Sequence, residues 1–454
     1  MINLFVYFIS FSIGFLLIRL ILGEKANISF FLHCALALGL GLASSAALTF
    51  FFLLIYGQFN QAGLIAINLA LLLFLAALNF FFVLKNSYAE SLEKIKHEAV
   101  LRITMIALWI IAAVMIAILS QQFPFGGWDA WGLYNLKAKF LVFAGNHWTD
   151  VARLHSHTQP SYPLLLPLIN TWIFSVFQKD LIQVASMTGV VFCLSCGFLL
   201  YAGLATFIKR SVAFLASLLL LTTPSYIFWS TTQYADVLLA YYLLASVILL
   251  ILLVRMQEQR IALLAGLFWG IMPFAKNEGI VLMLLFIIIT FGFLLISKSF
   301  RPSKPLRLIR SLLFGVALSA SPTIIFKIFL APVTKEVLFN PFVYKLKYCN
   351  IGGFLTTIHF FANTMLSLGW TFIWVLIALT AVLSYKKWFF VKELRMLTMI
   401  FFGFGLSLLY VYLMTAHFDL TWRLECTAIR IVLYLLPSIL FLGIYALWVK
   451  IPKD

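Results

Sequence analysis

Residues 236–254 read DVLLAYYLLASVILLILLV, an apolar run whose single charged residue, Asp236, stands at its start. A helix needs roughly 20 mostly apolar residues to cross a bilayer. Comparable segments follow one another along the chain, which predicts an all-α polytopic membrane protein. The predicted helical segments are 2–22, 28–56, 62–84, 101–120, 161–178, 182–207, 211–229, 236–254, 261–275, 279–297, 308–330, 355–384, 396–415 and 428–449.

The composition of the chain supports this class. Its 454 residues are 64% hydrophobic and only 10% charged, with a mean hydropathy of +1.06. A soluble domain is roughly 45–50% apolar and about 25% charged. The apolar excess therefore excludes cytoplasmic enzymes, secreted disulfide scaffolds and disordered chains. The 5 cysteines are too few and too scattered for a disulfide framework.

The net charge is +17, from 32 Lys and Arg against 15 Asp and Glu. A soluble protein with this charge would suggest nucleic acid, but in a membrane protein basic residues mark the cytoplasmic loops, so no nucleic-acid partner is predicted. The stretches predicted to be cytoplasmic are 85–102, 209–210, 255–260, 298–310 and 386–395. Alternation then places 57–61, 121–160, 231–236, 276–279, 331–353 and 416–427 on the opposite face. This outer face is the periplasm if the protein lies in a bacterial inner membrane.

One crossing in this arrangement is inconsistent. An odd number of spans must separate the outer loop 121–160 from the inner pair at 209–210, whereas two apolar segments lie between them. Segment 161–178 is the better candidate for the one that fails to span, because Pro163 and Pro167 disrupt helical hydrogen bonds. About thirteen spanning helices remain. No internal repeat is visible, so residues 1–454 are predicted to form a single membrane domain.

The longest polar interruption, 121–160, contains the sequence Gly-Trp-Asp-Ala-Trp at residues 127–131. Asp129 is a candidate catalytic residue, and the alternative is that it only caps a helix. Trp128 and Trp131 suit either an interfacial anchor or a platform on which a sugar stacks.

An amphipathic helix lying on the membrane surface is predicted over residues 129–144. Its apolar stripe contains Trp131, Tyr134, Ala138 and Leu141.

Two histidines further along this loop do not indicate a metal site. His155 and His157 are two residues apart, so they cannot share a helix face, and no third ligand follows at a regular spacing. A solvated loop is the favoured interpretation. No cofactor is predicted, and a divalent metal is conceivable but has no support in the sequence.

Charged residues beside apolar segments are costly, so each is a hypothesis for a functional residue. Asp236 begins one apolar segment, where it is either functional or a partner of the helix dipole. Lys276 and Glu278 interrupt another apolar stretch, which fits a broken helix pair around a cavity or a purely structural ion pair.

Arg430 lies inside the last helical segment, and an arginine there suits a phosphate group because the guanidinium binds phosphate with two hydrogen bonds. The alternative is that its side chain extends to the membrane interface. Trp422 precedes it on the outer face. Lys345 and Lys347 lie in the outer loop 331–353, where they are expected to meet anionic lipid headgroups or a lipid phosphate.

Four of these motifs resemble the GT-C superfamily of integral-membrane glycosyltransferases, which includes protein O-mannosyltransferases and lipid A aminoarabinose transferases. They are Gly127-Trp128-Asp129-Ala130-Trp131 with the Tyr162-Pro163 entry into the next helix, Tyr234-Ala235-Asp236, Lys276-Asn277-Glu278-Gly279, and Asp419-Leu420-x-Trp422 with Arg430 and Pro437. Together they span about 120–440. Their order and their shared outer face are more specific than any single motif.

The resemblance implies transfer of a sugar from a polyprenyl-phosphate donor to a glycan, lipid or protein acceptor at the outer face. Such a reaction needs a base for the acceptor hydroxyl and cations for the departing phosphate. We assign Asp129 as the base in a single inverting step, and Asp236 or Glu278 as the group that positions the sugar or acceptor. Lys276 and Arg430 are assigned to the phosphate.

The remaining predicted substrate contacts are Trp128, Trp131, Tyr162, Lys345, Lys347 and Trp422. A transporter or flippase of lipid-linked sugars is the alternative function, since buried charges and broken helices suit it too. Against it, no inverted repeat is visible and the polar residues gather at one face.

Overall fold

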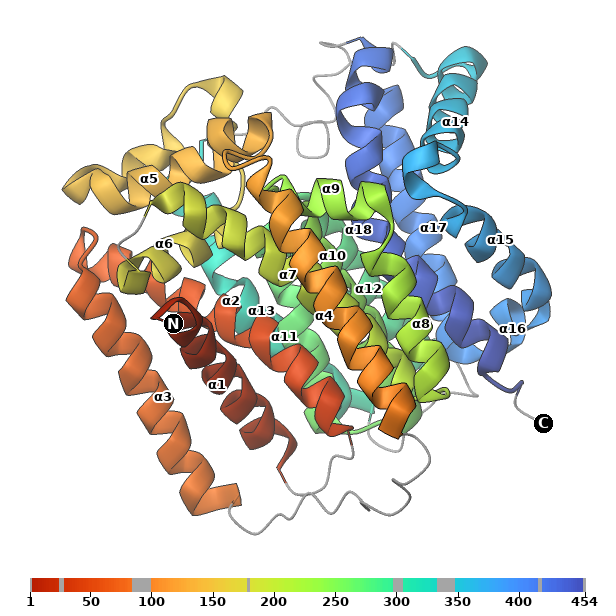
Figure 1. Cartoon of the computed structure of the whole chain (residues 1–454), viewed down its shortest axis with the longest axis horizontal. Helices are drawn as coiled ribbons and strands as arrows, with labels where there is room; N and C mark the ends of the chain where they lie inside the picture. The colour runs from red at the N-terminus through yellow and green to blue at the C-terminus, as the bar shows by residue number, and fades with distance from the viewer. Residues whose placement is uncertain are drawn as a thin grey trace. The chain divides into compact units, whose positions relative to one another are not determined.

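The computed structural model describes residues 2–23, 28–83, 99–177, 180–296, 305–332, 348–414 and 419–451. Every regular element within these residues is a helix, and Figure 1 shows their order. Ten of the described helices are long and apolar enough to cross a membrane, which confirms the predicted all-α polytopic class. These helices are α1 (Ile2–Leu22), α2 (Phe30–Tyr56), α3 (Gln61–Val83), α4 (Ala99–Gln121), α7 (Leu181–Ala205), α10 (Ala235–Met256), α12 (Glu278–Ile296), α13 (Pro305–Ile325, extended by the π-helix η5, Phe326–Leu330), α17 (Lys392–Leu413) and α18 (Leu420–Trp448).

The number of long helices is lower than the predicted count of about thirteen. An eleventh span results if α8 (Arg210–Leu221) and α9 (Pro224–Thr231), which bend by 63° at their junction, are taken together. The other apolar segments form the shorter helices α6 (Leu165–Phe177), α11 (Gln259–Ala275) and α15 (Ile373–Leu383). Segment 161–178 is thus the shortened one, with 13 residues in α6 against 25 in α7.

The prediction of one continuous helix over 355–384 is wrong. The chain forms α14 (Ile351–Met365), a short 3-10 helix η7 (Leu368–Trp370) and then α15. Thr371 adopts a positive φ of 55° between them, a conformation that cannot continue a right-handed helix. Apolar composition concealed this break because the residues around it are themselves apolar.

The described chain divides into two compact units. The N-terminal unit contains Met1–Trp148, Leu165–Thr222 and Tyr226–Val237, and the C-terminal unit contains Thr149–Leu164, Thr223–Ser225 and Leu238–Asp454. Each unit is assembled from separated segments of the chain. The prediction of a single domain stays a prediction.

In the N-terminal unit, α1 and α2 pack closely through small residues. A Cβ atom on Gly14 would overlap the Ala37 carbonyl oxygen, and one on Gly41 would overlap the Ser10 carbonyl oxygen. Such close approach of small residues is a common basis of helix association in membranes. The Ser10 hydroxyl also lies 3.1 Å from the Ser45 hydroxyl, which satisfies both polar groups in this apolar core.

In the C-terminal unit, α11 and α13 form the most extensive helix pair. A Cβ atom on Gly266 would overlap the Leu312 carbonyl oxygen, and one on Gly315 would overlap the Leu263 carbonyl oxygen. The close contact holds the middle of α11 against α13, and at the end of α11 the chain turns into α12. That turn carries the charged sequence 276–278.

Cys193 and Cys196 in α7 are both fully buried and are not joined by a disulfide.

Candidate active site

The predicted base, Asp129, lies at the junction between a tight turn and a helix in the N-terminal unit. Gly126 adopts a φ of +69°, and the π-helix η1 (Ala130–Tyr134) begins directly after Asp129. The Asp129 backbone N–H points to the Tyr234 hydroxyl oxygen at 3.4 Å. The carboxylate is half-buried. The loop that carries it is therefore held from the side by residues just before α10.

The alternative role of Asp129 as a helix cap finds no support in the geometry, because its side chain makes no capping hydrogen bond to η1. Two other aspartates do cap helices. Asp180 accepts the Ile182 N–H at 3.0 Å, and Asp419 accepts the Thr421 N–H at 3.0 Å. Asp419 thus has a structural function at the start of α18, whereas Asp129 has none of this kind.

Within the predicted range 129–144, η1 and α5 (Asn135–Phe143) form helix. Tyr134, Ala138 and Leu141 are fully buried, as the predicted stripe required. Trp131, however, is 49% exposed and does not belong to the stripe. The reason is the wider turn of the π-helix, which rotates Trp131 away from the residues that follow.

Trp131 instead pairs with Trp128 across the turn that holds Asp129. The two ring centroids are 4.4 Å apart with an interplanar angle of 69°, and Trp128 is 65% exposed. Two exposed indole rings beside a carboxylate are a suitable surface for a sugar or for the membrane interface. The geometry leaves both predicted roles open.

Asp236 lies in the first turn of α10, two residues after Tyr234, and its side chain is fully buried. An acidic residue at this position is favoured by the helix dipole. The N-terminal unit thus brings together the Asp129 loop and the segment that leads to Asp236.

In the C-terminal unit, the charged turn between α11 and α12 is closely packed. The Lys276 ammonium lies 3.1 Å from the Glu278 carboxylate, and it also lies 5.3 Å from the centre of the Tyr434 ring. Lys276 is only 2% exposed. The second carboxylate oxygen of Glu278, Oε2, is buried and makes no hydrogen bond within the described part of the chain.

A second lysine, which the sequence analysis did not predict, contacts this turn. Lys327, in the π-helix η5, donates to the Asn277 side-chain oxygen at 2.8 Å and to the Ser161 carbonyl oxygen at 2.7 Å. The predicted substrate residue Tyr162 follows Ser161 directly and is half-buried. Asn277 therefore follows one lysine in sequence and accepts a hydrogen bond from a second, which also binds the segment that contains Tyr162.

Arg430 lies on the face of α18 that meets this turn. It precedes Tyr434 by four residues, so the two side chains project from neighbouring positions on the helix. Arg430 therefore lies on the side of α18 that carries Tyr434, whose ring faces the Lys276 ammonium.

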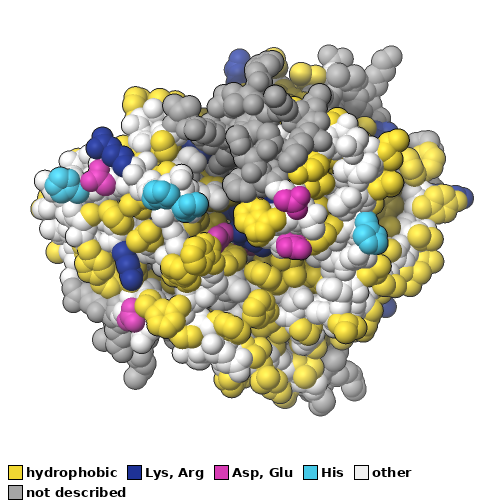
Figure 2. Space-filling view, turned by 90° about the horizontal axis from the view of Figure 1, so that it is seen from above, with side chains coloured by type: hydrophobic (Ala, Val, Ile, Leu, Met, Phe, Trp, Pro, Cys, Tyr) yellow, Lys and Arg dark blue, Asp and Glu magenta, His cyan; other side chains and the backbone are white. Residues whose placement is uncertain are grey.

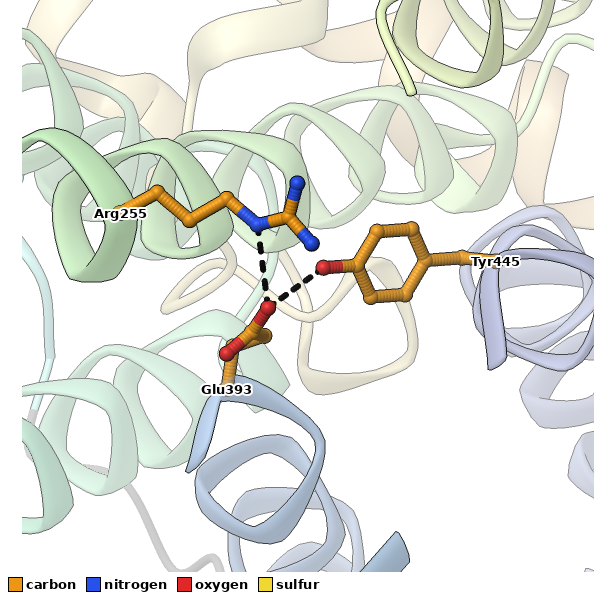
Figure 3. Close-up of polar contacts among 3 residues, drawn as sticks. All are labelled: Arg255, Glu393 and Tyr445. Carbon is orange, nitrogen blue, oxygen red and sulfur yellow. Dashed lines mark hydrogen bonds and ion pairs between the residues drawn. The ribbon is translucent and has the colours of Figure 1, made fainter. Parts of the chain in front are cut away.

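A third polar cluster, which the sequence analysis did not predict, links the C-terminal end of α10 to α17 and α18. Glu393 accepts a hydrogen bond of 2.6 Å from the Tyr445 hydroxyl and one of 3.1 Å from Arg255 Nε, as Figure 3 shows. The Arg255 guanidinium also lies 5.3 Å from the centre of the Tyr445 ring. Glu393 thus joins side chains from α10 and α18 to the start of α17, which indicates a structural role.

Several predicted residues lie apart from these clusters. Trp422 is 51% exposed at the start of α18. The exposed rings of His155 and His157 stack on each other in a short 3-10 helix, and no group of three metal-ligating side chains occurs among the residues described above. Lys345 and Lys347 lie outside the described residues. In the face seen in Figure 2, charged side chains and histidines are scattered among apolar ones.

Comparison with known proteins supports the resemblance found in the motifs. Residues 161–326 match the family model of dolichyl-phosphate-mannose-protein mannosyltransferases, which is a domain of the GT-C superfamily. The match includes Tyr162, Asp236, Lys276 and Glu278, whereas Asp129 and Arg430 lie outside it. No curated protein and no solved structure matches the chain significantly.

Proposed function

We propose that the protein transfers a sugar from a polyprenyl-phosphate donor to an acceptor hydroxyl, because residues 161–326 match the family model of dolichyl-phosphate-mannose-protein mannosyltransferases. The observation that carries the proposal is the cluster at 276–278, where Lys276, Asn277 and Glu278 gather polar groups from α12, α18 and η5. Charges held at the ends of apolar helices suit a substrate with a charged head and an apolar tail.

The cations of this cluster are assigned to the donor phosphate. When the bond between the sugar and the phosphate breaks, the phosphate oxygen takes the bonding electron pair and its negative charge grows. Lys276 and Arg430 stabilise this charge, and Lys327 adds a further ammonium group beside Asn277. The polyprenyl chain is expected to lie along apolar helix surfaces, which removes the need for a soluble nucleotide site.

Asp129 is assigned as the base. It accepts the proton of the acceptor hydroxyl while the acceptor oxygen attacks the anomeric carbon, so that the reaction inverts the configuration in one step. This assignment is supported by the half-buried position of Asp129 beside the exposed rings of Trp128 and Trp131.

Glu278 and Asp236 are assigned to hydroxyl groups of the sugar or acceptor. The buried Glu278 Oε2 lacks a hydrogen-bond donor within the described residues, and a buried acceptor of this kind costs about 1–3 kcal/mol when it stays unpaired. A sugar hydroxyl would supply the missing donor.

The aromatic residues Trp128 and Trp131 are assigned to the acceptor, and Tyr162 and Trp422 to either substrate. Lys345 and Lys347 are assigned to lipid headgroups. We place the reaction at the periplasmic face of a bacterial inner membrane, with a glycan, lipid or protein as acceptor.

Reconstituted protein tests the proposal directly. Transfer from polyprenyl-phosphate sugars is followed by mass analysis of the acceptor, with D129N as the test variant and D150N as the control. Asp150 is a suitable control because it lies on the surface in a loose ion pair with Arg153 at 3.5 Å. We expect D129N to abolish transfer but to retain polyprenyl-phosphate binding.

Two outcomes would contradict these assignments. Wild-type transfer rates in D129N would refute the base. Movement of a lipid-linked sugar across sealed vesicles without any transfer would favour the transporter alternative over the glycosyltransferase.

A further inference from the structure

The segment Thr232–Gln233–Tyr234, which connects α9 to α10, contacts the Asp129 loop at several points. The Gln233 side chain is only 2% exposed. Its Nε2 group donates to the Pro124 carbonyl oxygen at 2.8 Å and lies 3.4 Å from the Phe123 carbonyl oxygen. Its Oε1 atom accepts from Asn135 Nδ2 at 2.9 Å. One side chain thus binds both the start of the loop and the start of α5.

The orientation of both amides follows from their partners. Two carbonyl oxygens face one end of the Gln233 amide, so that end must be the NH₂ group, because an oxygen there would meet only acceptors. The Gln233 oxygen therefore faces Asn135, which must present its own NH₂ group. The direction of each hydrogen bond in this buried network is fixed by chemistry.

The backbone of the same segment adds further contacts. The Gly127 N–H donates to the Thr232 carbonyl oxygen at 3.1 Å, and a Cβ atom on Gly127 would overlap the Tyr234 hydroxyl. Gln233 itself adopts a φ of +65°, a conformation that is unfavourable for a residue with a side chain. The chain accepts this conformation where the buried amide reaches its three partners.

We propose that Gln233 is the positioning residue of the candidate active site, which holds the Asp129 loop against the start of α10. These contacts are observed in the structure, whereas their effect on the reaction rate rests on the proposed function. When the amide is removed, the loop loses the Gln233 hydrogen bonds on both sides of Asp129 and keeps the backbone contacts of Gly127 and Asp129. The carboxylate then samples positions from which it cannot reach the acceptor proton, and a displacement of 1 Å can cost about 100-fold in rate.

The chain offers a matched control at the opposite end of α10. Gln257 also has a positive φ, 54°, but its side chain is exposed. Q233A and Q257A therefore impose the same backbone penalty, and only Q233A removes a buried amide network. The milder variant N135A removes a single hydrogen bond from the network and guards against failure of Q233A to fold.

Two measurements on the full-length protein separate the contact from its consequence. Hydrogen–deuterium exchange reports the loop itself, and we expect amides of residues 123–135 to exchange about tenfold faster in Q233A and unchanged in Q257A. Steady-state kinetics report the consequence. We expect kcat to fall about 100-fold in Q233A while the KM for the donor stays within about twofold.

The combined variant Q233A/N135A tests whether the two amides act as a unit. We expect its loss of kcat to equal that of Q233A alone, because the Asn135 bond is already broken. The proposal would be overturned if Q233A matched Q257A in amide exchange and in kcat. It would also be overturned if the KM of Q233A for the donor rose by the same factor by which kcat fell. If the wild-type protein shows no transfer, the proposed function fails, and the exchange measurement still decides whether Gln233 holds the loop.

Discussion

The ion pair between Lys276 and Glu278 allows a sharp test, because a purely structural pair and a catalytic pair respond differently when both charges are removed. The side chains are 3% and 24% exposed, respectively, and 3.1 Å apart. Removal of one partner from a buried pair leaves the other charge uncompensated, which costs about 3–5 kcal/mol. For E278Q we expect about 3 kcal/mol, at the lower end, because the Tyr434 ring still stabilises the lysine.

The double variant K276M/E278Q removes both charges. Apolar replacement of a buried pair is often neutral, so we expect it to lie within about 1 kcal/mol of the wild type. The melting temperature in detergent should fall by about 3–6 °C in E278Q and by about 1 °C in the double variant. These values assume a shift of about 1–2 °C per kcal/mol, because the shift becomes smaller as the chain becomes longer. Transfer should stay at least about 100-fold below wild type in the double variant, because the phosphate has lost a cation and the sugar an acceptor.

Recovery of both stability and transfer in K276M/E278Q would refute the catalytic role and leave a structural ion pair. Protection of each variant against unfolding by added polyprenyl phosphate provides the binding measurement, because a ligand of the native state raises its stability. Loss of this protection together with normal folding is the expected result for the double variant.

Two further variants address the clusters that surround this pair. R430A should weaken polyprenyl-phosphate binding about 10–100-fold, because a charge-assisted contact is lost. The control is R423A, which should leave binding within about twofold, because the Arg423 guanidinium donates to the end of α17. Equal binding in both variants would refute the assignment of Arg430 to the phosphate. E393A should lower the free energy of unfolding by about 2–4 kcal/mol, because the Tyr445 hydroxyl loses a charged acceptor. The ion pair with Arg255 adds little to this loss, because the Arg255 side chain is 39% exposed to solvent. The stability of purified E393A in a denaturant series checks this value, and a change below about 0.5 kcal/mol would show that the cluster is dispensable.

The fold was predictable where a single local property determines it. Apolar length identified the spanning helices, and Pro163 and Pro167 correctly indicated that the segment around them is shortened. The break at Thr371 was not predictable, since it depends on a backbone conformation within an apolar stretch. The rotation of Trp131 away from its predicted stripe depends in the same way on a π-helical turn.

The candidate site was predictable in its charged residues but not in their partners. Lys276, Glu278 and Arg430 stand out because charge is rare in apolar segments. Lys327 lies inside a segment that was counted as one spanning helix, so its meeting with Asn277 became visible only in the structure. Gln233 carries no charge, and its hydrogen-bond partners lie about a hundred positions away in sequence.

The burial of α10 has a consequence for how the protein is made. Among the ten long helices described, α10 is the most apolar, and yet protein buries its whole apolar span. The apolar span of α4 is only 17% buried. Hydrophobicity in α10 therefore serves entry into the bilayer rather than residence among lipids. In the folded protein, side chains of the same chain cover the apolar surface of α10, a surface that α4 leaves mostly uncovered.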